Sequence, residues 1–232
     1  MRIVIAAVTL AGAIALGAPA EASAQPLCAD FGGTVGADQM CDVHVDNSTY
    51  MLDMNFPVDY PDQGPLTDYL TQTRDGFVSV AEMPGSFGLP YALDVTSTRY
   101  GSGTPTDGTS SVVLEVYQNV GGAHPSTWYQ SFNYNLKTKA PITFDSLFAP
   151  NTKPLDVIFP LVQQDLEKQS GLTQPVDVGD GMNPENYQAF ALSNDDVTFF
   201  FSQGGLMAEA AGATKVTIPR SAVAPLLAPD LA

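Results

Sequence analysis

His44 and His124 are the only histidines in the sequence, and histidine is the side chain whose ordinary pKa lies near neutral pH. They therefore limit any acid–base mechanism. His124 follows two glycines that let the backbone bend, and Pro125 restricts it to an extended conformation. This stretch can fix an imidazole at the end of a hairpin, although a capping or buried hydrogen-bonding histidine is the alternative. We take His124 as the candidate catalytic base, and the candidate binding residues are Gly121, Gly122, His124 and Trp128.

The serine that would serve as nucleophile is not identified by a motif. Serine hydrolases commonly place this residue in Gly-x-Ser-x-Gly, and the nearest stretch, Pro84–Gly88, has its first glycine out of place. Such a stretch is also typical of a break after a helix. A serine nucleophile needs a nearby base. Ser126 lies two residues from His124, whereas Ser202 and Ser221 would reach it only through folding, so we leave the nucleophile open.

The remaining polar clusters favour ordinary surface roles. His44 alternates with Asp42 and Asp46 in a predicted strand, which is typical of a solvated face. Oxygen-bearing side chains suited to calcium occur near two glycines, but their spacing is not that of a known calcium loop: Asp177, Asp180, Asn183 and Glu185. Zinc, phosphate-loop and dinucleotide motifs are absent from the sequence. We therefore expect neither a metal site nor a cofactor.

The cysteines and the first residues indicate an exported protein. A basic start, an apolar run from Ile3 to Leu16 and the small residues Ala22-Ser23-Ala24 follow the order of a signal peptide. We expect removal of residues 1–24, with residues 25–232 forming one domain. The alternatives are an earlier cut after Ala20 and retention as a membrane anchor, for which the run is short.

Cys28 and Cys41 are the only cysteines, and both belong to the exported part. Outside the cytosol such a pair oxidises, and a disulfide across this short loop is worth about 3 kcal/mol of stability. A zinc site that used His44 as a third ligand is the weaker alternative. The expected molecule is therefore secreted, is held by one disulfide and keeps no transmembrane anchor after cleavage.

Charge excludes some classes of partner. The chain has 9 Lys and Arg against 25 Asp and Glu, a formal net charge of −16. Such a surface repels the phosphates of nucleic acids, and it disfavours anionic lipid headgroups for the same reason. A cationic extracellular protein would instead be attracted. The 25 carboxylates also make it impossible to single out an acid–base pair for glycoside cleavage from the sequence alone.

Periodicity predicts an α+β fold made of mainly antiparallel sheet and two main helices. The first helix begins after Asp62, its predicted N-cap. The second spans residues 155–169, where Pro160 is either tolerated or kinks the helix. Alternating patterns predict strands, and no βαβ alternation is evident. The predicted strands are 39–46, 50–58, 91–100, 111–120, 127–136, one or two within 190–201, and 214–218; residues 101–108 and 174–183 are predicted as connections, and 221–228 as a short helix.

The run Gly121–Pro125 resembles a stretch of the secreted mycobacterial immunogenic proteins of the MPT/MPB sixty-four type and their cell-wall esterase relatives. More distantly, the chain is similar to the extracytoplasmic domain of the anti-sigma factor RsiV. Further stretches occur in the same order from Cys28 to Ala228; they are 60–63, 73–75, 116–119, 141–145, 186–188, 209–212 and 218–221. The resemblance implies a β-grasp-like part and an envelope or secreted location. It transfers no catalytic residue, and signalling is not carried over.

Two functions follow as hypotheses. The first is a secreted or cell-wall-associated binding protein whose partner is a cationic extracellular protein or host factor, such as lysozyme, since RsiV-like domains bind lysozyme. The alternative is a cell-wall esterase that cleaves acyl esters with His124 as base. A purely structural or antigenic role is a third possibility. From the sequence alone we place the binding protein first, because catalytic motifs are absent.

Overall fold

The computed structural model describes residues 27–122 and 124–231, and the predicted signal peptide lies outside the described residues. The strands are β1 Thr34–Val35, β2 Met40–Asp46, β3 Tyr50–Pro57, β4 Tyr91–Thr104, β5 Asp107–Asn119, β6 Ser126–Asn135, β7 Ala140–Pro141, β8 Phe190–Leu192, β9 Asp196–Phe201 and β10 Thr214–Pro219. The helices are α2 Gln63–Ala81, α3 Phe144–Leu147, α4 Leu155–Ser170, α5 Val178–Gly181 and α6 Arg220–Val223, with single 3₁₀ turns η1 Pro184–Tyr187, η2 Glu209–Ala211 and η3 Ala224–Leu226.

Seven strands form one sheet in the order β1-β2-β3-β4-β5-β6-β7. The neighbours in this sheet pair antiparallel except β3 and β4, which are parallel because α2 crosses over between them. This single βαβ unit differs from the absence of βαβ alternation in the sequence pattern. The α+β class with mainly antiparallel sheet is confirmed, and a long helix across a mixed sheet agrees with the β-grasp-like part.

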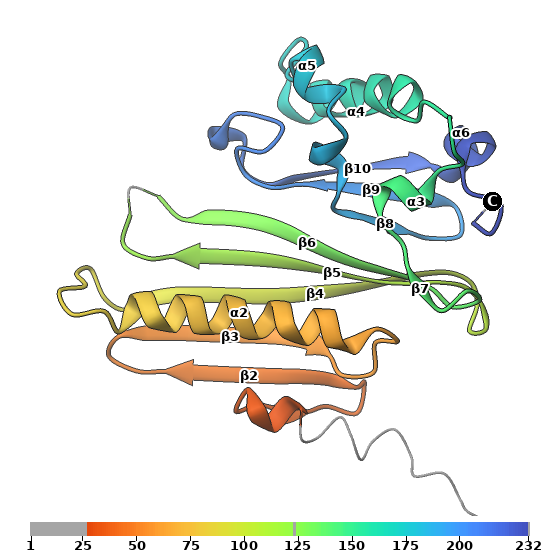
Figure 1. The fold of residues 1–232 in the computed structure, drawn as a ribbon. Helices are drawn as coiled ribbons and strands as arrows, with labels where there is room; N and C mark the ends of the chain where they lie inside the picture. Colours follow the sequence, from red (N-terminus) through yellow and green to blue (C-terminus); the bar gives the residue numbers. More distant parts are fainter. Residues whose placement is uncertain (1–26, 123, 232) are drawn as a thin grey trace, which may run out of the picture.

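Helix α2 lies across one face of this sheet (Figure 1). Its apolar stripe of Leu66, Leu70, Phe77 and Ala81 is buried, as expected for residues at helical spacing. The alternate residues of the central strands meet it from the sheet, so that a first apolar cluster, the α2 cluster, forms between helix and sheet. Its members on the strands include Leu52, Met54, Phe56, Leu93, Val95, Leu114 and Val116.

The C-terminal part forms a second layer, with a three-stranded sheet in the order β10-β9-β8 and the helix α4 packed on it. A second apolar cluster, the α4 cluster, fills this layer; it includes Ile158, Val162, Leu166, Phe190, Phe199 and Val216. The layer meets the large sheet on the face opposite α2, through a small third cluster of Val113, Ala191 and Phe200. On the same face, Asp42, His44 and Asp46 of β2 and Met51 and Asp53 of β3 are exposed.

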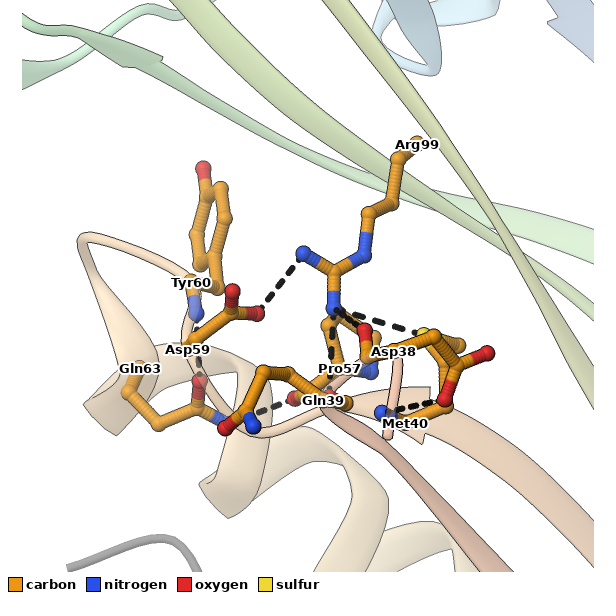
Figure 2. Close-up of polar contacts among 8 residues, drawn as sticks. All are labelled: Asp38, Gln39, Met40, Pro57, Asp59, Tyr60, Gln63 and Arg99. Carbon is orange, nitrogen blue, oxygen red and sulfur yellow. Dashed lines mark hydrogen bonds and ion pairs between the residues drawn. The ribbon is translucent and has the colours of Figure 1, made fainter. Parts of the chain in front are cut away.

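Arg99 links β4 to the segments on either side of the β2–β3 hairpin (Figure 2). Its Nη1 lies 2.7 Å from the carboxylate of Asp59, and its Nη2 donates to the carbonyl oxygen of Gln39 at 3.1 Å. Gln39 has a positive φ of 60°, which turns its carbonyl into this position. A single guanidinium therefore ties three segments that are distant in sequence.

Gln63 fixes the start of α2. Its Oε1 accepts from the backbone N–H of Tyr60 at 3.0 Å, and its Nε2 donates to the carbonyl of Pro57 at 3.1 Å (Figure 2). Asp62 occupies the predicted N-cap position, but its side chain makes no capping hydrogen bond. The stretch 60–63, which contributes to the family resemblance, thus has a structural role.

Several predicted elements differ at their ends. Most of residues 101–108, predicted as a connection, belong to the extended strands β4 and β5, and only 105–106 form the turn between them. The hydroxyls of Ser102 and Thr109 lie 2.8 Å apart across this ladder. The predicted loop 174–183 contains the one-turn helix α5, capped by the Asp177 side chain on Gly179 N–H. Pro160 is accommodated on the exposed side of α4, and the predicted helix 221–228 is divided into α6 and η3.

Cys28 and Cys41 form a disulfide across a sequence separation of 13, as predicted. Both half-cystines are buried in the α2 cluster. Within residues 27–122 and 124–231, no helix combines the length and apolar character that a membrane span requires.

Candidate functional site

The β5–β6 connection carries the glycines predicted for the site. Gly121 has φ of +71°, in the left-handed region that favours glycine, and its N–H donates to Asn119 Oδ1 at 3.1 Å. A Cβ at this position would lie 2.9 Å from the Tyr91 ring. The Tyr91 hydroxyl in turn donates to the carbonyl of Phe87 at 3.1 Å. The connection is thus packed against the loop that follows α2.

His124 meets a carboxylate from the second layer. Its Nε2 lies 3.2 Å from Glu209 Oε2, and its Nδ1 lies 3.3 Å from the carbonyl oxygen of Pro125. Both side chains of the pair are more than half exposed, at 56% and 65%. Glu209 begins η2, in the β9–β10 connection, which reaches the same end of the molecule as the β5–β6 connection (Figure 1). We call His124 and Glu209 the His–Glu pair.

Glu209 was not among the residues selected from the sequence. It is far from His124 along the chain, and no sequence spacing predicts that a turn between β9 and β10 contacts the connection between β5 and β6. The only signal was that stretch 209–212 is one of those that carry the family resemblance.

The serines considered as nucleophiles take separate positions. Ser126 is exposed at the start of β6, and Ser202 follows β9, where its Oγ accepts from Tyr129 N–H at 3.1 Å. Ser221 lies in α6, at the opposite end of the molecule from the β5–β6 connection (Figure 1). Among the described residues, no serine hydroxyl lies within hydrogen-bonding distance of His124. The Ser86 hydroxyl donates to Val80 and Met83 carbonyls at the end of α2.

Trp128 lies on the face of the large sheet that packs against α2. Its ring packs against the α2 cluster, and its Nε1 donates to the Tyr69 hydroxyl at 2.7 Å. The structure therefore brings Gly121, Gly122 and His124 together in one connection, and it directs Trp128 towards α2.

A cavity of about 600 Å³ adjoins η2. It lies between the end of α4 and the β9–β10 connection, and its wall is mostly apolar, including Leu172, Pro175, Met207, Ala208, Ala210, Ala211 and Ala213. Ala208 and Ala210 are the chain neighbours of Glu209, so one short segment supplies both the carboxylate of the pair and part of the cavity wall. This volume lies within the range of small-molecule sites.

Exposed acidic side chains gather on the face of the large sheet opposite α2. Cross-strand pairing places His44 opposite Asp53, and Asp53 opposite Asp94. His44 Nδ1 lies 2.6 Å from Asp53 Oδ1, and the hydrogen bond and charge of Asp53 raise the pKa of His44 above its usual 6.5. Burial, with a further contribution from Asp53, raises the pKa of Asp94. The acidic face, as we call it, carries Asp42, His44, Asp46, Asp53, Asp94 and Glu115, all exposed.

The oxygen-rich stretch considered for calcium serves as caps. The Asp177 side chain accepts from Gly179 N–H, and the Asn183 side chain accepts from Glu185 N–H. Across the part of the chain that the structure describes, no group of three or more His, Cys, Asp or Glu side chains is arranged to hold a metal ion.

Comparison with known proteins gives matches over nearly the whole chain. A protein of Mycobacterium tuberculosis named Esterase Rv3036c is 51% identical over 226 residues, which are 97% of this chain and 99% of the relative. Immunogenic protein MPB64 of Mycobacterium bovis and Immunogenic protein MPT64 of Mycobacterium tuberculosis are each 43% identical over 209 residues, 90% of this chain and 91% of the relative.

The second layer has its own match. A family described as a protein of unknown function (DUF3298) matches residues 145–221, from α3 to α6. A crystal structure of a DUF3298 family protein from Pseudomonas aeruginosa has a TM-score of 0.54 and 13% identity, over 86% of this chain and 97% of that chain. This likeness concerns the fold. By its full-length relatives, the chain belongs to the family that includes the mycobacterial immunogenic proteins MPB64 and MPT64 and the esterase Rv3036c.

Proposed function

We propose that the protein is an exported carboxylic ester hydrolase that acts on acyl esters. The observation that carries this proposal is the 51% identity, over 97% of the chain, to a relative named as an esterase. The absence of catalytic motifs in the sequence favours a binding role, but the identity to a relative named as an esterase gives the hydrolase the stronger support.

The His–Glu pair supplies the chemistry. A carboxylate at Nε2 holds the imidazole with its proton on that nitrogen, so that Nδ1 is the atom left to accept a proton. The contact of Nδ1 with the Pro125 carbonyl is long, at 3.3 Å, and a hydroxyl group can replace it. His124 then removes the proton of the attacking hydroxyl and returns it to the leaving alcohol. If the attacking hydroxyl belongs to a serine, the acyl group stays on that oxygen until water, deprotonated in turn by His124, cleaves it as the acid; if it belongs to water, the acid forms directly. In both cases an ester and water give an acid and an alcohol.

Hydrolysis of a soluble short-chain ester tests the proposal, with wild type compared with His124→Ala and Glu209→Gln. We expect loss of turnover of about 100-fold or more for His124→Ala and a smaller loss for Glu209→Gln. A matched control is His44→Ala, which removes the other histidine from the acidic face. Turnover that is absent in the wild type, or equal in the wild type and His124→Ala, contradicts the proposal.

The nucleophile can be identified in the same assay. Of the three serines considered as nucleophiles from the sequence, Ser126 and Ser202 lie at the end of the molecule that carries His124. Substitution of the correct serine by alanine abolishes turnover and any covalent labelling by a phosphonate ester. If neither alanine variant loses turnover, neither of these two hydroxyls is the nucleophile.

We propose that residues 1–24 are an export signal and that the protein works outside the cytoplasmic membrane. The Cys28–Cys41 disulfide supports this location, because disulfides persist in oxidising compartments. Amino-terminal sequencing of protein recovered from culture filtrate tests it. A sequence that begins at Gln25 is expected, and one that begins at Met1 contradicts it.

The acidic face favours a second candidate function, the binding of a cationic protein or host factor such as lysozyme. This face is open, and its outward positions on β2 to β5 carry no Lys or Arg; Arg99 points to the α2 side with Tyr91, Leu93 and Val95. Opposite charges on two proteins speed their encounter and fix its orientation, most strongly at low salt.

Calorimetric titration with a cationic lysozyme at two salt concentrations tests this function. We expect binding that weakens at the higher salt. The double variant Asp53→Asn/Asp94→Asn should bind more weakly than the control Asp68→Asn/Asp145→Asn, which removes the same charge from exposed positions elsewhere. The absence of heat at both salt concentrations counts against this partner.

A further inference from the structure

The loop that follows α2 exposes large apolar side chains beside the candidate site. The side chains of Met83, Phe87 and Leu89 are 56%, 76% and 37% exposed. Between Glu82 and Asp94 the sequence has no charged residue, although the whole chain has a net charge of −16. Contiguous exposed apolar patches on soluble proteins mark surfaces that interact with proteins, membranes or ligands. We call residues 83–89 the apolar loop.

Hydrogen bonds hold the apolar loop in place. The Ser86 hydroxyl donates to the carbonyl of Met83 at 2.8 Å, and the Tyr91 hydroxyl donates to the carbonyl of Phe87 at 3.1 Å. The polar groups of the loop are therefore turned towards the protein, and the Phe87 ring is left in solvent. Gly121 packs against the same carbonyl and the same tyrosine, so the loop adjoins the connection that carries His124.

We infer that the apolar loop docks the protein on an uncharged lipid aggregate, and that the substrate is a lipid ester in that aggregate. This inference rests on the ester hydrolase function proposed above. Transfer of the Phe, Leu and Met side chains of a neutral loop from water into a layer of acyl chains is favourable, because it removes apolar surface from water. The acidic remainder of the molecule is repelled by anionic headgroups, so an uncharged surface fits the charge of both parts.

The cavity beside η2 gives the acyl chain a place near the His–Glu pair. Leu172, which is 59% exposed, and Met207 stand on its wall, and the segment that includes Ala210 separates it from Glu209. The segments after α2, between β5 and β6 and between β9 and β10 lie at one end of the fold (Figure 1). A docked molecule would thus hold the lipid surface at the apolar loop, the ester at His124 and the acyl chain in the cavity.

Sedimentation with vesicles of pure phosphatidylcholine tests the docking without any catalytic readout. We expect the wild type to bind and Phe87→Ser to bind about tenfold more weakly. Val178→Ser is the matched control, because Val178 is 66% exposed in α5 and lies outside the apolar loop. It should bind as the wild type does. Unchanged thermal unfolding midpoints exclude misfolding as the cause.

Several results would overturn the inference. They are no binding by the wild type, equal binding by Phe87→Ser, or binding only when the vesicles contain an anionic lipid. Sedimentation velocity adds one more: if Phe87→Ser abolishes a dimer and leaves vesicle binding unchanged, the loop docks a second copy of the chain.

Kinetics separate this inference from the proposed function. With an ester of limited solubility, the wild-type rate should rise sharply once the ester forms aggregates, and Phe87→Ser should lose most of that rise. Vesicle binding without turnover of any ester contradicts the hydrolase and with it the lipid-ester substrate, and supports the docking. Turnover of soluble ester without vesicle binding and without a rise on aggregation contradicts only the lipid docking.

Discussion

Gly121 shows how a single residue determines the shape of the β5–β6 connection. Its positive φ and its contact with the Tyr91 ring both require the absence of a side chain, whereas an added Cβ on Gly122 would meet no atom within 4 Å. The two adjacent glycines therefore have different roles, which the sequence pattern alone does not distinguish.

We predict that Gly121→Ala destabilises the protein by about 2 kcal/mol, because alanine is strained in the left-handed region and would also press on Tyr91. Gly122→Ala, its control, should change stability by less than about 0.5 kcal/mol. Chemical denaturation followed by circular dichroism measures both. Equal effects of the two substitutions would show that the left-handed turn is not formed.

His44 and Asp53 predict a pH dependence. The Asp53 hydrogen bond raises the pKa of His44 in the folded protein above 6.5. The stabilisation from this pair is therefore fully present below pH 6.5 and is lost as pH rises through the raised pKa. Titration of the imidazole by nuclear magnetic resonance should give a midpoint above 6.5 that returns towards 6.5 in Asp53→Asn. An unchanged midpoint in that variant contradicts the pairing.

At the candidate site, the glycines and His124 can be selected from the sequence because backbone freedom and imidazole chemistry are properties of single residues. Glu209 could not be found in this way, since its contact with His124 depends on how two layers stack. Trp128 was grouped with His124 by proximity in sequence, but the alternation of side chains along β6 turns it towards α2.

Among the elements, a polar contact between β6 and the middle of α2 lies within an apolar interface. Trp128 Nε1 donates to the Tyr69 hydroxyl at 2.7 Å, where both side chains are partly buried. The hydrogen bond fixes the position of the helix along β6, while the apolar stripe supplies most of the free energy.

We predict that Tyr69→Phe destabilises the protein by about 1 kcal/mol, because the indole N–H loses its partner. Trp128→Phe should cost more, since it also removes buried ring area. The double variant should cost less than the two single costs combined, by about 1 kcal/mol. Denaturant unfolding of the four proteins completes the cycle, and strictly additive costs would show that the hydrogen bond contributes nothing.

Most elements could be predicted because the 2.0 and 3.6 periods of buried residues reflect the two faces they pack against. The errors have local causes. Pro105 and the pair Asp107-Gly108 suggested a connection in 101–108, but they belong to a close turn that lets β4 and β5 extend. The crossover of α2 was missed because a single βαβ unit leaves no repeated alternation in the sequence.

For the whole molecule, two large apolar clusters are coupled through a small one. Phe200 stands at this junction: it is buried, and its ring centroid lies 6.0 Å from that of Tyr100 and 5.2 Å from that of Tyr129. The two layers therefore pack against each other, on the sheet face opposite α2, through a small number of aromatic contacts.

We predict that Phe200→Ala destabilises the protein by about 3–5 kcal/mol and separates the unfolding of the two layers. Trp128 is the single tryptophan and packs on the α2 cluster, so its fluorescence reports that layer alone. In the variant, the fluorescence transition should no longer coincide with that of far-ultraviolet circular dichroism. Phe77→Ala, within the α2 cluster, serves as control. Coincident transitions in Phe200→Ala would show that the junction does not couple the layers.

The Cys28–Cys41 bridge has a consequence for biogenesis. Under the export proposed above, both thiols would leave the translocation channel before β3 and β4 do, so an oxidoreductase could close the disulfide ring on a chain that is still being translocated. The ring ties Cys28 to β2, and an aminopeptidase acting on the proposed mature end would stop at Cys28, after a few residues.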